Sequence, residues 1–282
     1  MNAAKCKLNN NYYAKIDKSK IYIDYINNRV KIVNFHKISV QTIKRIIRYA
    51  SRQHLSKVVC NCDTAYFQTF SDAGFILEGK IDSYFRGEDA LCMSYFIIGK
   101  RKACKNDNME KLFLMKSLNV KNSFKFSNNF KYQIRNAKES DIDELIDLFS
   151  SAFFAYPSQI YDKDYLIQNM NKNVLYKVAT YNGKIIGAAS AFLDYENLNA
   201  EIADCATYPH YRDKGILSNI IYLLELDLKK EGFISLYSLS RAINPSINIV
   251  LSKHGFNFRG KLVNDCNICG EFESINIWAK DI

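Results

Sequence analysis

Two carboxylates, Glu201 and Asp204, lie three residues apart in a run over residues 200–207 that has the character of a β-strand. A carboxyl group whose pKa is raised by burial can accept a proton near neutral pH, so either side chain could serve as a general base. In a regular strand, residues three apart point to opposite faces of the sheet, and a β-bulge between them would bring both to one face. The alternative for each is a carboxylate at the sheet surface that pairs with a cation.

The loop after this strand has the residue types that hold a pyrophosphate. Arg212 and Lys214 supply positive charge, and Gly215 lies where the chain enters a helix predicted at 216–230. The N-terminus of a helix directs unpaired backbone N–H groups towards an anion, and a glycine lets the backbone come close to the phosphates. R-x-x-G at a helix start is a weak motif alone, and its place between this strand and this helix makes it strong.

Hydrophobic periodicity and turn signals predict the elements that hold this strand and loop. Asn182-Gly183 predicts a two-residue hairpin, and Asn244-Pro245 opens a helix that Gly255 closes. We expect a strand at 132–136, helices from 140 and at 163–170, strands at 175–181, 184–193 and 200–207, a helix at 216–230, a strand at 233–240, a helix at 245–254, and strands at 256–264 and 274–280. This order predicts a mixed α/β sheet with helices on its faces.

The first half of the chain repeats part of this pattern. Residues 74–81, Gly-Phe-Ile-Leu-Glu-Gly-Lys-Ile, match residues 255–262, Gly-Phe-Asn-Phe-Arg-Gly-Lys-Leu. A strand at 57–62, a helix at 64–73 and a strand at 90–97 parallel elements of the second half, and chance similarity is the alternative. We therefore expect two domains: residues 1–125, a degenerate α/β half-copy with a polar connector, and residues 131–282, which hold the chemistry.

The segment 201–217 resembles the acetyl-CoA-binding motif of the GNAT superfamily of N-acetyltransferases, [Gln/Arg]-x-x-Gly-x-[Gly/Ala], which follows the fourth strand of that fold. The resemblance covers residues 131–282 in element order as well as in motif. It implies a GNAT acyl-CoA N-acyltransferase fold there, preceded by a half-GNAT-like α/β domain, with acetyl-CoA as co-substrate and direct transfer of acetyl to a neutral amine. The cofactor-binding residues that it implies are Cys205, Ala206, Thr207, Arg212, Asp213, Lys214, Gly215, Ile216, Leu217 and Asn244.

The resemblance also implies roles for the chemical step. Glu201 lies where several relatives carry the base and is placed ahead of Asp204, and backbone N–H groups near Ala206 would meet the thioester oxyanion. Two positions depart from the family pattern. Leu217 replaces the last Gly/Ala of the motif, and Leu251 stands where many members keep the tyrosine that protonates the departing thiolate. Another donor is then needed, or the thiolate leaves unprotonated, which an ordinary thiol pKa of about 8.5 allows.

A closer similarity, to the β-lysine N6-acetyltransferases, covers nearly the full length. It is carried by Tyr156-Pro157 and by residues 204–207, 240–242, 262–264, 273–278, 75–79 and 84–89. It implies acetylation of the terminal amine of β-lysine, giving N6-acetyl-β-lysine, a compatible solute used in osmoadaptation. A β-amino acid needs a cation for its carboxylate and acceptors for its β-ammonium. We expect Arg241, with Arg259 as the second candidate, to bind the carboxylate, and Asp204, Glu273 or Asn264 to accept from the ammonium. Tyr156 and Trp278 could line the methylene chain, and a core position in a terminal strand is the alternative for Trp278.

Charge is distributed unevenly along the chain. Residues 1–130 hold 23 Lys and Arg against 10 Asp and Glu, whereas residues 131–282 hold 16 against 19. The run Lys100-Arg101-Lys102 could contact phosphates, but a solvated face and a polar connector are the simpler interpretation, so we expect no nucleic-acid partner. A mildly acidic second half suits a small cationic amine as substrate.

No apolar stretch is long enough to span a membrane, and the N-terminus lacks the apolar core of a secretory signal. We therefore expect a cytoplasmic protein without a membrane partner. The eight cysteines are scattered, as free thiols would be, and Cys266-x-x-Cys269 lacks the second ligand pair of a structural zinc site, so no metal is expected. The half-copy would be retained for packing, within the chain or across a homodimer.

Three other functions stay open at this point. The enzyme could acetylate another small amine, such as lysine or a polyamine, and a carboxylate-binding arginine would argue against the polyamine. Leu251 in place of the family tyrosine favours a non-catalytic acetyl-CoA-binding regulatory module. A basic first half that bound RNA or DNA would show binding that weakens steeply with salt.

Overall fold

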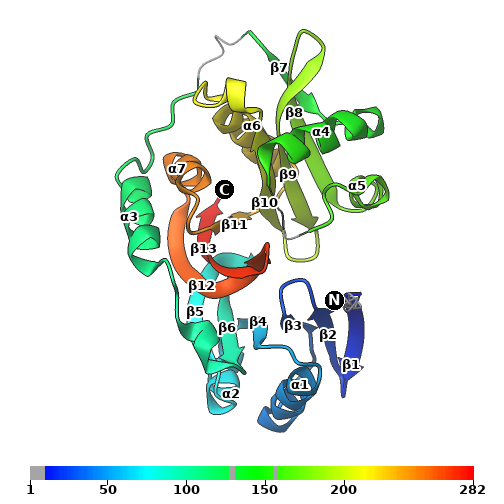
Figure 1. Cartoon of the computed structure of the whole chain (residues 1–282), viewed down its shortest axis with the longest axis vertical. Helices are drawn as coiled ribbons and strands as arrows, with labels where there is room; N and C mark the ends of the chain where they lie inside the picture. The colour runs from blue at the N-terminus through cyan, green and yellow to red at the C-terminus, as the bar shows by residue number, and fades with distance from the viewer. Residues whose placement is uncertain (1–9, 127–130, 155, 157) are drawn as a thin grey trace, which may run out of the picture.

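The computed structural model describes residues 10–126, 131–154, 156 and 158–282. Within these residues, thirteen strands form one continuous sheet in the order β1-β2-β3-β4-β6-β5-β12-β13-β11-β10-β9-β8-β7. Figure 1 shows the C-terminal half in the upper part of the molecule and the N-terminal half in the lower part. The predicted mixed α/β sheet is confirmed, and the first half extends it.

The C-terminal half follows the predicted element order. Asn182 and Gly183 both have positive φ in the tight turn between β8 and β9, as the hairpin signal requires. The elements are β7 (Gln133–Asn136), α4 (Ile142–Ala152), α5 (Lys163–Met170), β8 (Val174–Tyr181), β9 (Lys184–Asp194), β10 (Asn199–Thr207), α6 (Ile216–Lys230), β11 (Ser235–Arg241), α7 (Pro245–Lys253), β12 (Asn257–Ile268) and β13 (Glu271–Asp281).

Helices cover both faces of this half of the sheet. Buried residues of α6, among them Ile220 and Leu224, pack with Ala200 and Ile202 of β10 in one core cluster. Buried residues of α4 and α5 pack in a second cluster that includes Ala206 near the end of the same strand. Ala200, Ile202 and Ala206 would share one face of a regular strand, but the β-bulge between Ala203 and Ala206 turns Ala206 to the other side, so the two clusters lie on opposite faces of the sheet.

The N-terminal half has its own core around α1. Ile43, Ile46 and Ala50 of this helix are buried against the strands, and Ser39 caps its start, accepting a hydrogen bond from the Thr42 N–H at 3.2 Å. The elements are β1 (Tyr12–Ile16), β2 (Ser19–Asp24), β3 (Arg29–Asn34), α1 (Val40–Arg52), β4 (Lys57–Asp63), α2 (Phe67–Asp72), β5 (Ile76–Phe85) and β6 (Glu88–Phe96).

The two halves are related by an approximate two-fold arrangement of elements. Outward from the middle of the sheet, the strand order is β5-β6-β4-β3-β2-β1 on one side and β12-β13-β11-β10-β9-β8 on the other. In each half the pairing is antiparallel except between β3 and β4 and between β10 and β11. The repeat is therefore longer than the sequence comparison predicted, because β1, β2, β3 and α1 also have counterparts.

The joint between the halves is a single residue pair. Gly79 of β5 lies opposite Gly260 of β12 in the antiparallel ladder. A Cβ at Gly79 would lie 2.8 Å from the Gly260 Cα, and a Cβ at Gly260 would lie 2.5 Å from the Gly79 Cα. Both positions therefore require glycine for the close approach of two backbones.

A hairpin of each half also contacts a turn of the other half. The β12–β13 hairpin contacts the β2–β3 turn, where the Asn267 N–H donates to Asn27 Oδ1 at 3.0 Å. The β5–β6 hairpin contacts the β9–β10 turn, where Asn199 Nδ2 donates to the Tyr84 carbonyl at 2.6 Å. The first half therefore packs on the second within the chain, which is one of the two kinds of packing expected for the half-copy.

The polar connector, which follows β6 and contains α3 (Asp107–Leu118), contacts both halves. Its helix lies beside α7, and the Phe124 N–H donates to the Lys253 carbonyl at 3.1 Å. Arg101 is buried, with Nε donating to the Asn264 carbonyl at 2.9 Å and Nη2 to the Asn27 carbonyl at 2.8 Å. This arginine is therefore part of the interface and is not presented to a nucleic acid.

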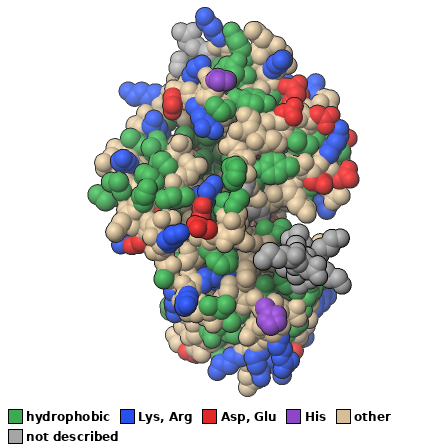
Figure 2. Space-filling view, viewed as in Figure 1, with side chains coloured by type: hydrophobic (Ala, Val, Ile, Leu, Met, Phe, Trp, Pro, Cys, Tyr) green, Lys and Arg blue, Asp and Glu red, His purple; other side chains and the backbone are tan. Residues whose placement is uncertain are grey.

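Surface charge is unevenly distributed over the molecule. Figure 2 shows acidic side chains gathered in the region of α4 and α5, and Lys and Arg side chains at the opposite end, where α1 lies. Arg45 and Arg48 of α1 are exposed, as are Asp143 and Glu144 of α4. The acidic side chains of the visible face thus gather around α4 and α5, while Lys and Arg lie on both halves.

Candidate active site

Strands β10 and β11 separate after a short parallel contact. They pair only from Asn199 to Glu201 and from Ser235 to Tyr237, although both strands continue beyond that point. A serine hydroxyl makes the last link, with Ser238 Oγ donating to the Ile202 carbonyl at 2.7 Å. The second half of β10 therefore has a backbone edge that β11 does not pair.

A cavity of about 1950 Å³ opens beside this divergence. Both halves line it: β10 and β11 contribute residues from Glu201 to Cys205 and from Tyr237 to Arg241, and the N-terminal half contributes residues of β2, β3 and the β5–β6 hairpin. A volume of this size exceeds the usual range of small-molecule sites, and of the predicted cofactor residues Cys205 and Asn244 line it.

A β-bulge places Glu201 and Asp204 on the same face of β10. The ladder to β9 shifts register between Ala203 and Ala206, and Asp204 has a left-handed φ of 45°. The alternation of a regular strand would put the two carboxylates on opposite faces. The structure instead brings both into the wall of the cavity.

Within the described residues, the Glu201 side chain in the cavity wall accepts one long hydrogen bond. Tyr237 donates its hydroxyl to Glu201 Oε2 at 3.3 Å, and the Tyr84 ring from the N-terminal half lies 5.6 Å from the Tyr237 ring. Burial raises the pKa of Glu201, with a further increase from Asp204, while Lys31 acts in the opposite direction. A carboxylate whose pKa is raised and whose oxygen accepts only a long hydrogen bond is suited to accept a proton.

Asp204 is enclosed by hydroxyl groups. Ser190 donates to its Oδ2 at 2.8 Å and Tyr176 at 3.3 Å, and the Asp204 N–H donates to the Tyr156 hydroxyl at 3.2 Å. Burial raises the pKa of this carboxyl group, and the three hydroxyl groups oppose that increase. Asp204 is only 3% exposed, so it is less accessible to a substrate than Glu201.

The predicted phosphate loop has an open helix N-terminus. Gly215 stands in the N-cap position of α6 with φ of 73°, and no side chain caps the helix. Arg212 and Lys214 are exposed and form no ion pair within the described residues, although Lys214 lies 5.1 Å from the Tyr211 ring centroid. The free N–H groups and the positive end of the helix dipole lie next in sequence to these two exposed cations, and this set of groups fits a pyrophosphate.

The remaining predicted cofactor residues lie around this loop. Cys205, Ala206 and Thr207 end β10, Asp213 has a left-handed φ of 60° in the loop, and Ile216 and Leu217 begin α6 with their side chains against its core. Asn244 lines the cavity, but its Oδ1 caps α7, accepting from the Ser246 N–H at 3.1 Å. Its amide nitrogen remains the group that could reach a ligand.

Two residues discussed for the reaction belong to the core. Leu251 is fully buried in the cluster around α6, and Trp278 is fully buried with its Nε1 donating to Asn248 Oδ1 at 2.8 Å. Neither lines the cavity. The expectation that Trp278 lines the methylene chain of the substrate is therefore wrong, because this side chain fills the space between sheet and helix.

The predicted substrate residues are not brought together. Tyr156 lines the cavity, whereas Arg241, also at its wall, forms a bidentate pair with Glu273 in which both N–O distances are 2.7 Å. Asn264 lies outside the cavity lining and donates to the carbonyls of Arg101 and Ala103 at 2.8 and 2.9 Å. Arg241 would have to give up Glu273 to bind a carboxylate.

The sequence analysis missed the contribution of the N-terminal half to this cavity. Lys31 of β3 and Tyr84 of β5 line it beside Glu201. A signal for this was present: residues 24–27, Asp-Tyr-Ile-Asn, match residues 194–197, Asp-Tyr-Glu-Asn, and both turns form the same hydrogen bonds from the asparagine to the aspartate. Extending the repeat to this turn aligns Lys31 with Glu201.

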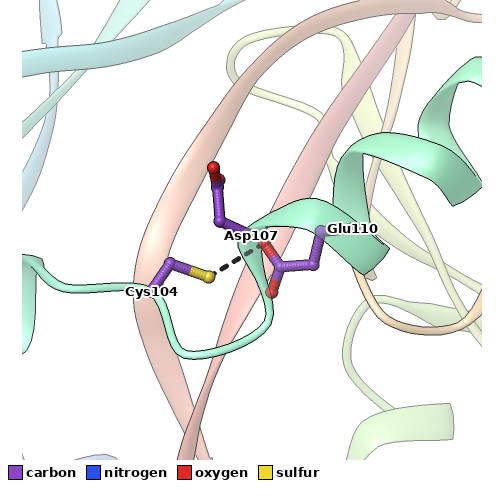
Figure 3. Close-up of side chains that lie close together, drawn as sticks. All are labelled: Cys104, Asp107 and Glu110. Carbon is purple, nitrogen blue, oxygen red and sulfur yellow. Dashed lines mark hydrogen bonds between the residues drawn. The ribbon is translucent and has the colours of Figure 1, made fainter.

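A cluster of possible metal ligands lies elsewhere, at the start of α3. Figure 3 shows Cys104, Asp107 and Glu110 close together, with the Cys104 thiol donating to Glu110 at 3.2 Å. The Lys261 ammonium lies 2.7 Å from Asp107 and 2.9 Å from Glu110. Lys111 also pairs with Asp107 at 2.7 Å, so two lysines balance the two carboxylates and account for the cluster without a metal ion. Cys266 and Cys269 are free thiols, and Cys6 lies outside the described residues.

Comparison with known proteins gives consistent matches. Residues 142–256 match the model of the acetyltransferase (GNAT) family. The β-lysine N6-acetyltransferase of Methanococcus maripaludis is 32% identical over 94% of this chain and 97% of its own length. The β-lysine N6-acetyltransferase of Methanosarcina mazei is 34% identical over 73% of this chain and 84% of its own. The N-acetyltransferase YodP of Bacillus subtilis is 26% identical over 92% and 94%. Within the described residues, no helix combines the length and apolar character of a membrane span.

Proposed function

Because the chain belongs to the GNAT family of N-acetyltransferases, alongside the β-lysine N6-acetyltransferases, we propose that it transfers acetyl from acetyl-CoA to the N6 amine of β-lysine. The observation that carries the proposal is the extent of the similarity. The match spans both halves of the chain, and the cavity beside Glu201 is lined by both halves. The similarity therefore extends well beyond the residues that match the GNAT family model.

Acetyl-CoA supplies an activated thioester, and the residues present fit it. The loop from Arg212 to Leu217 would hold the pyrophosphate through the free N–H groups of α6 and the two cations. The unpaired edge of β10, from Cys205 to Thr207, would hold the pantetheine arm by backbone hydrogen bonds, and Asn244 would contribute its amide.

Glu201 is proposed as the general base. The terminal amine of β-lysine is an ammonium in solution, since a lysine-like amine has a pKa near 10.4, and it must lose a proton before it can attack. Glu201 lines the cavity and has a raised pKa, so it can take that proton directly or through a water molecule. Asp204, held by Ser190 and Tyr176, would support Glu201 by raising its pKa.

The leaving group does not require the family tyrosine. The Leu251 side chain points into the core on the α6 side, so it leaves the reaction without an acid at that position. A thiolate is a tolerable leaving group near neutral pH, because an ordinary thiol has a pKa of about 8.5. We propose that the thiolate departs unprotonated.

The product, N6-acetyl-β-lysine, would keep a zwitterionic head and lose the charge of its side chain, as suits a compatible solute in osmoadaptation, and the enzyme would act in the cytoplasm. We propose residues 1–125 and 131–282 as the two domains, although they share one sheet. Residues 1–9 and 127–130 lie outside the described part of the chain.

The test is acetyl-CoA consumption by the purified protein with β-lysine, lysine, spermidine or no amine. We expect kcat/KM for β-lysine to exceed that for each other amine by at least about tenfold, the factor that about 1.4 kcal/mol of selective binding gives. Turnover of spermidine alone would reject β-lysine as the substrate. Tight binding of acetyl-CoA without turnover of any amine would indicate a regulatory module.

A further inference from the structure

Lys31 and Glu201 occupy equivalent positions in the two halves. Each is the third residue of its strand, in β3 and β10, and each lies opposite an aromatic residue of the preceding strand, Tyr22 for Lys31 and Phe192 for Glu201. All four side chains line the same cavity. The approximate two-fold arrangement therefore presents a lysine and a glutamate to one shared space.

Lys31 lacks a partner in this arrangement. It is half-buried and forms no hydrogen bond or ion pair with any residue in the described part of the chain. The adjacent cation on the same face, Arg29, is already satisfied, with Nε 3.0 Å from Asp24 and Nη1 paired with Asp265. Repulsion from Arg29, followed by burial, lowers the pKa of Lys31. Asp24 and Asp265 oppose this decrease, but neither pairs with Lys31 directly, and a half-buried ammonium without a hydrogen-bonded anion favours the binding of one.

The other cations around the cavity are less suited to hold an anion inside it. Arg241 is engaged by Glu273 in two hydrogen bonds. Lys15, Lys18 and Lys20 are exposed on the β1–β2 hairpin, where water competes for their charge. Among the described residues, Lys31 is thus the cavity cation that is both sheltered from solvent and unpaired.

We propose that Lys31 binds the carboxylate of the amino-acid substrate, so that the N-terminal half forms part of the active site. The inference rests on the proposed function and names the group that selects an amino acid over a simple amine. The substrate carries an ammonium at one end and a carboxylate at the other. Glu201 would receive the first and Lys31 the second, with Tyr22 and Phe192 beside the methylene chain. Lys31 replaces Arg241 in this role.

The experiment compares two substrates with the full-length enzyme. β-Lysine and 1,5-diaminopentane both offer a terminal amine, and only β-lysine has a carboxylate. We expect Lys31→Met to raise KM for β-lysine roughly 10- to 100-fold, as for a lost hydrogen bond to a charged group, with kcat little changed. The kinetics with 1,5-diaminopentane and KM for acetyl-CoA should not change. Rates are measured well above the acid limb of the pH profile, so that Glu201 stays ionised in both proteins.

Matched variants and a substrate analogue complete the design. Lys20→Met removes an exposed lysine from the same face of the neighbouring strand and should leave both substrates unaffected, while Lys31→Arg should retain most of the preference for β-lysine. If Lys31→Met does not fold, β-lysine amide tests the same contact, because wild-type enzyme should show a comparable rise in KM and Lys31→Arg should show it too.

The results distinguish a failure of the proposed function from a failure of the role proposed for Lys31. Wild-type enzyme that does not acetylate β-lysine would overturn the proposed function. Wild-type activity on β-lysine together with an unchanged KM in Lys31→Met would overturn only the role of Lys31. An equal loss with both substrates would assign Lys31 to the support of Glu201, and a loss of acetyl-CoA affinity would assign it to the cofactor; either result contradicts carboxylate binding.

Discussion

Gly79 and Gly260 lie opposite each other where the two halves of the sheet meet, and each occupies the space in which the other would need its Cβ. Backbone contact at this pair joins the halves into one sheet. Bulges also adjoin both glycines, between Leu77 and Gly79 and between Phe258 and Gly260, so the joint has the same irregularity on each side. The pair therefore fixes how closely the N-terminal half approaches the active site.

Gly79→Ala should destabilise the protein by about 1–3 kcal/mol, because the new methyl group would overlap backbone that cannot move independently. Unfolding in urea, followed by circular dichroism, measures the change. Gly99→Ala is the matched control, since a Cβ there meets nothing within 4 Å, and it should change stability by less than about 0.5 kcal/mol. Equal stability of the two variants would contradict a packed joint.

Glu201→Gln should lower kcat/KM for the amine by roughly 10²- to 10⁴-fold while the fold is retained, because an amide cannot accept the proton. In the wild-type protein, activity should fall as the pH drops through the raised pKa of Glu201, since the base must be ionised. The acid limb should therefore lie above the ordinary glutamate value of 4.5. Glu196→Gln, an exposed cavity residue, is the control and should keep its activity.

Lys31→Met should also move that acid limb to higher pH. Lys31 lowers the pKa of Glu201, so removing its charge leaves burial less opposed and raises the pKa further. The shift is read from kcat/KM against pH with 1,5-diaminopentane, whose binding does not involve a carboxylate. An unchanged or lower midpoint would show that the two side chains do not sense each other.

Gly215→Ala should raise KM for acetyl-CoA about 3- to 10-fold at unchanged kcat, because a left-handed φ of 73° costs an alanine about 1 kcal/mol and the loop would relax. Gly183→Ala has the same kind of strain, at φ of 76°, in the β8–β9 turn. It should lose similar stability and keep its KM for acetyl-CoA. A rise in KM in both variants would reject a specific role for the loop.

Asp265→Asn should cost about 3–5 kcal/mol, because Arg29 and Lys57 would lose a buried carboxylate that bridges the halves. Burial tends to raise the pKa of Asp265, but the surrounding cations lower it well below its usual range. A depressed pKa in the folded state means that this stability is complete above the unfolded value near 3.9 and is lost as the pH falls further.

Urea midpoints between pH 2 and 7 test this dependence, which should be weaker in Asp265→Asn. Glu271→Gln serves as its control, since the Glu271 carboxylate is 69% exposed and pairs with Lys105 at the surface. It should change the stability by less than about 1 kcal/mol. A steeper dependence on pH in Asp265→Asn than in the wild type would contradict the assignment.

Local signals in the sequence were enough for the C-terminal fold. Asn182-Gly183, Asn244-Pro245 and Gly255 mark turns and helix ends by backbone chemistry that acts within a few residues, and the corresponding elements begin and end close to them. The bulge at Asp204 could be raised as an alternative but not decided, because φ at one strand residue depends on the ladder to β9.

Contacts between segments that lie far apart in the sequence could not be predicted from such local signals. Arg241 was predicted to be available for a carboxylate, yet its bidentate pair with Glu273 depends on how β11 lies beside β13. Lys31 lies outside the repeat that is predicted from residue 57 onwards, and the match between residues 24–27 and 194–197 is only four residues long. Its proximity to Glu201 follows from the continuous sheet, which no local pattern encodes.

The two-fold arrangement has an implication for how such a pocket could arise. Two identical subunits that met at a glycine pair would carry the same residue at both equivalent positions, so a glutamate on one side would face a glutamate on the other. A duplicated and fused chain escapes that restriction, since each copy can change alone. Ser39 caps the start of α1, which corresponds to α6, the helix that begins after Gly215 without a side-chain cap. The two halves thus differ at the start of the equivalent helices as well as at the positions of Lys31 and Glu201, and only the C-terminal half keeps an uncapped helix N-terminus at this place.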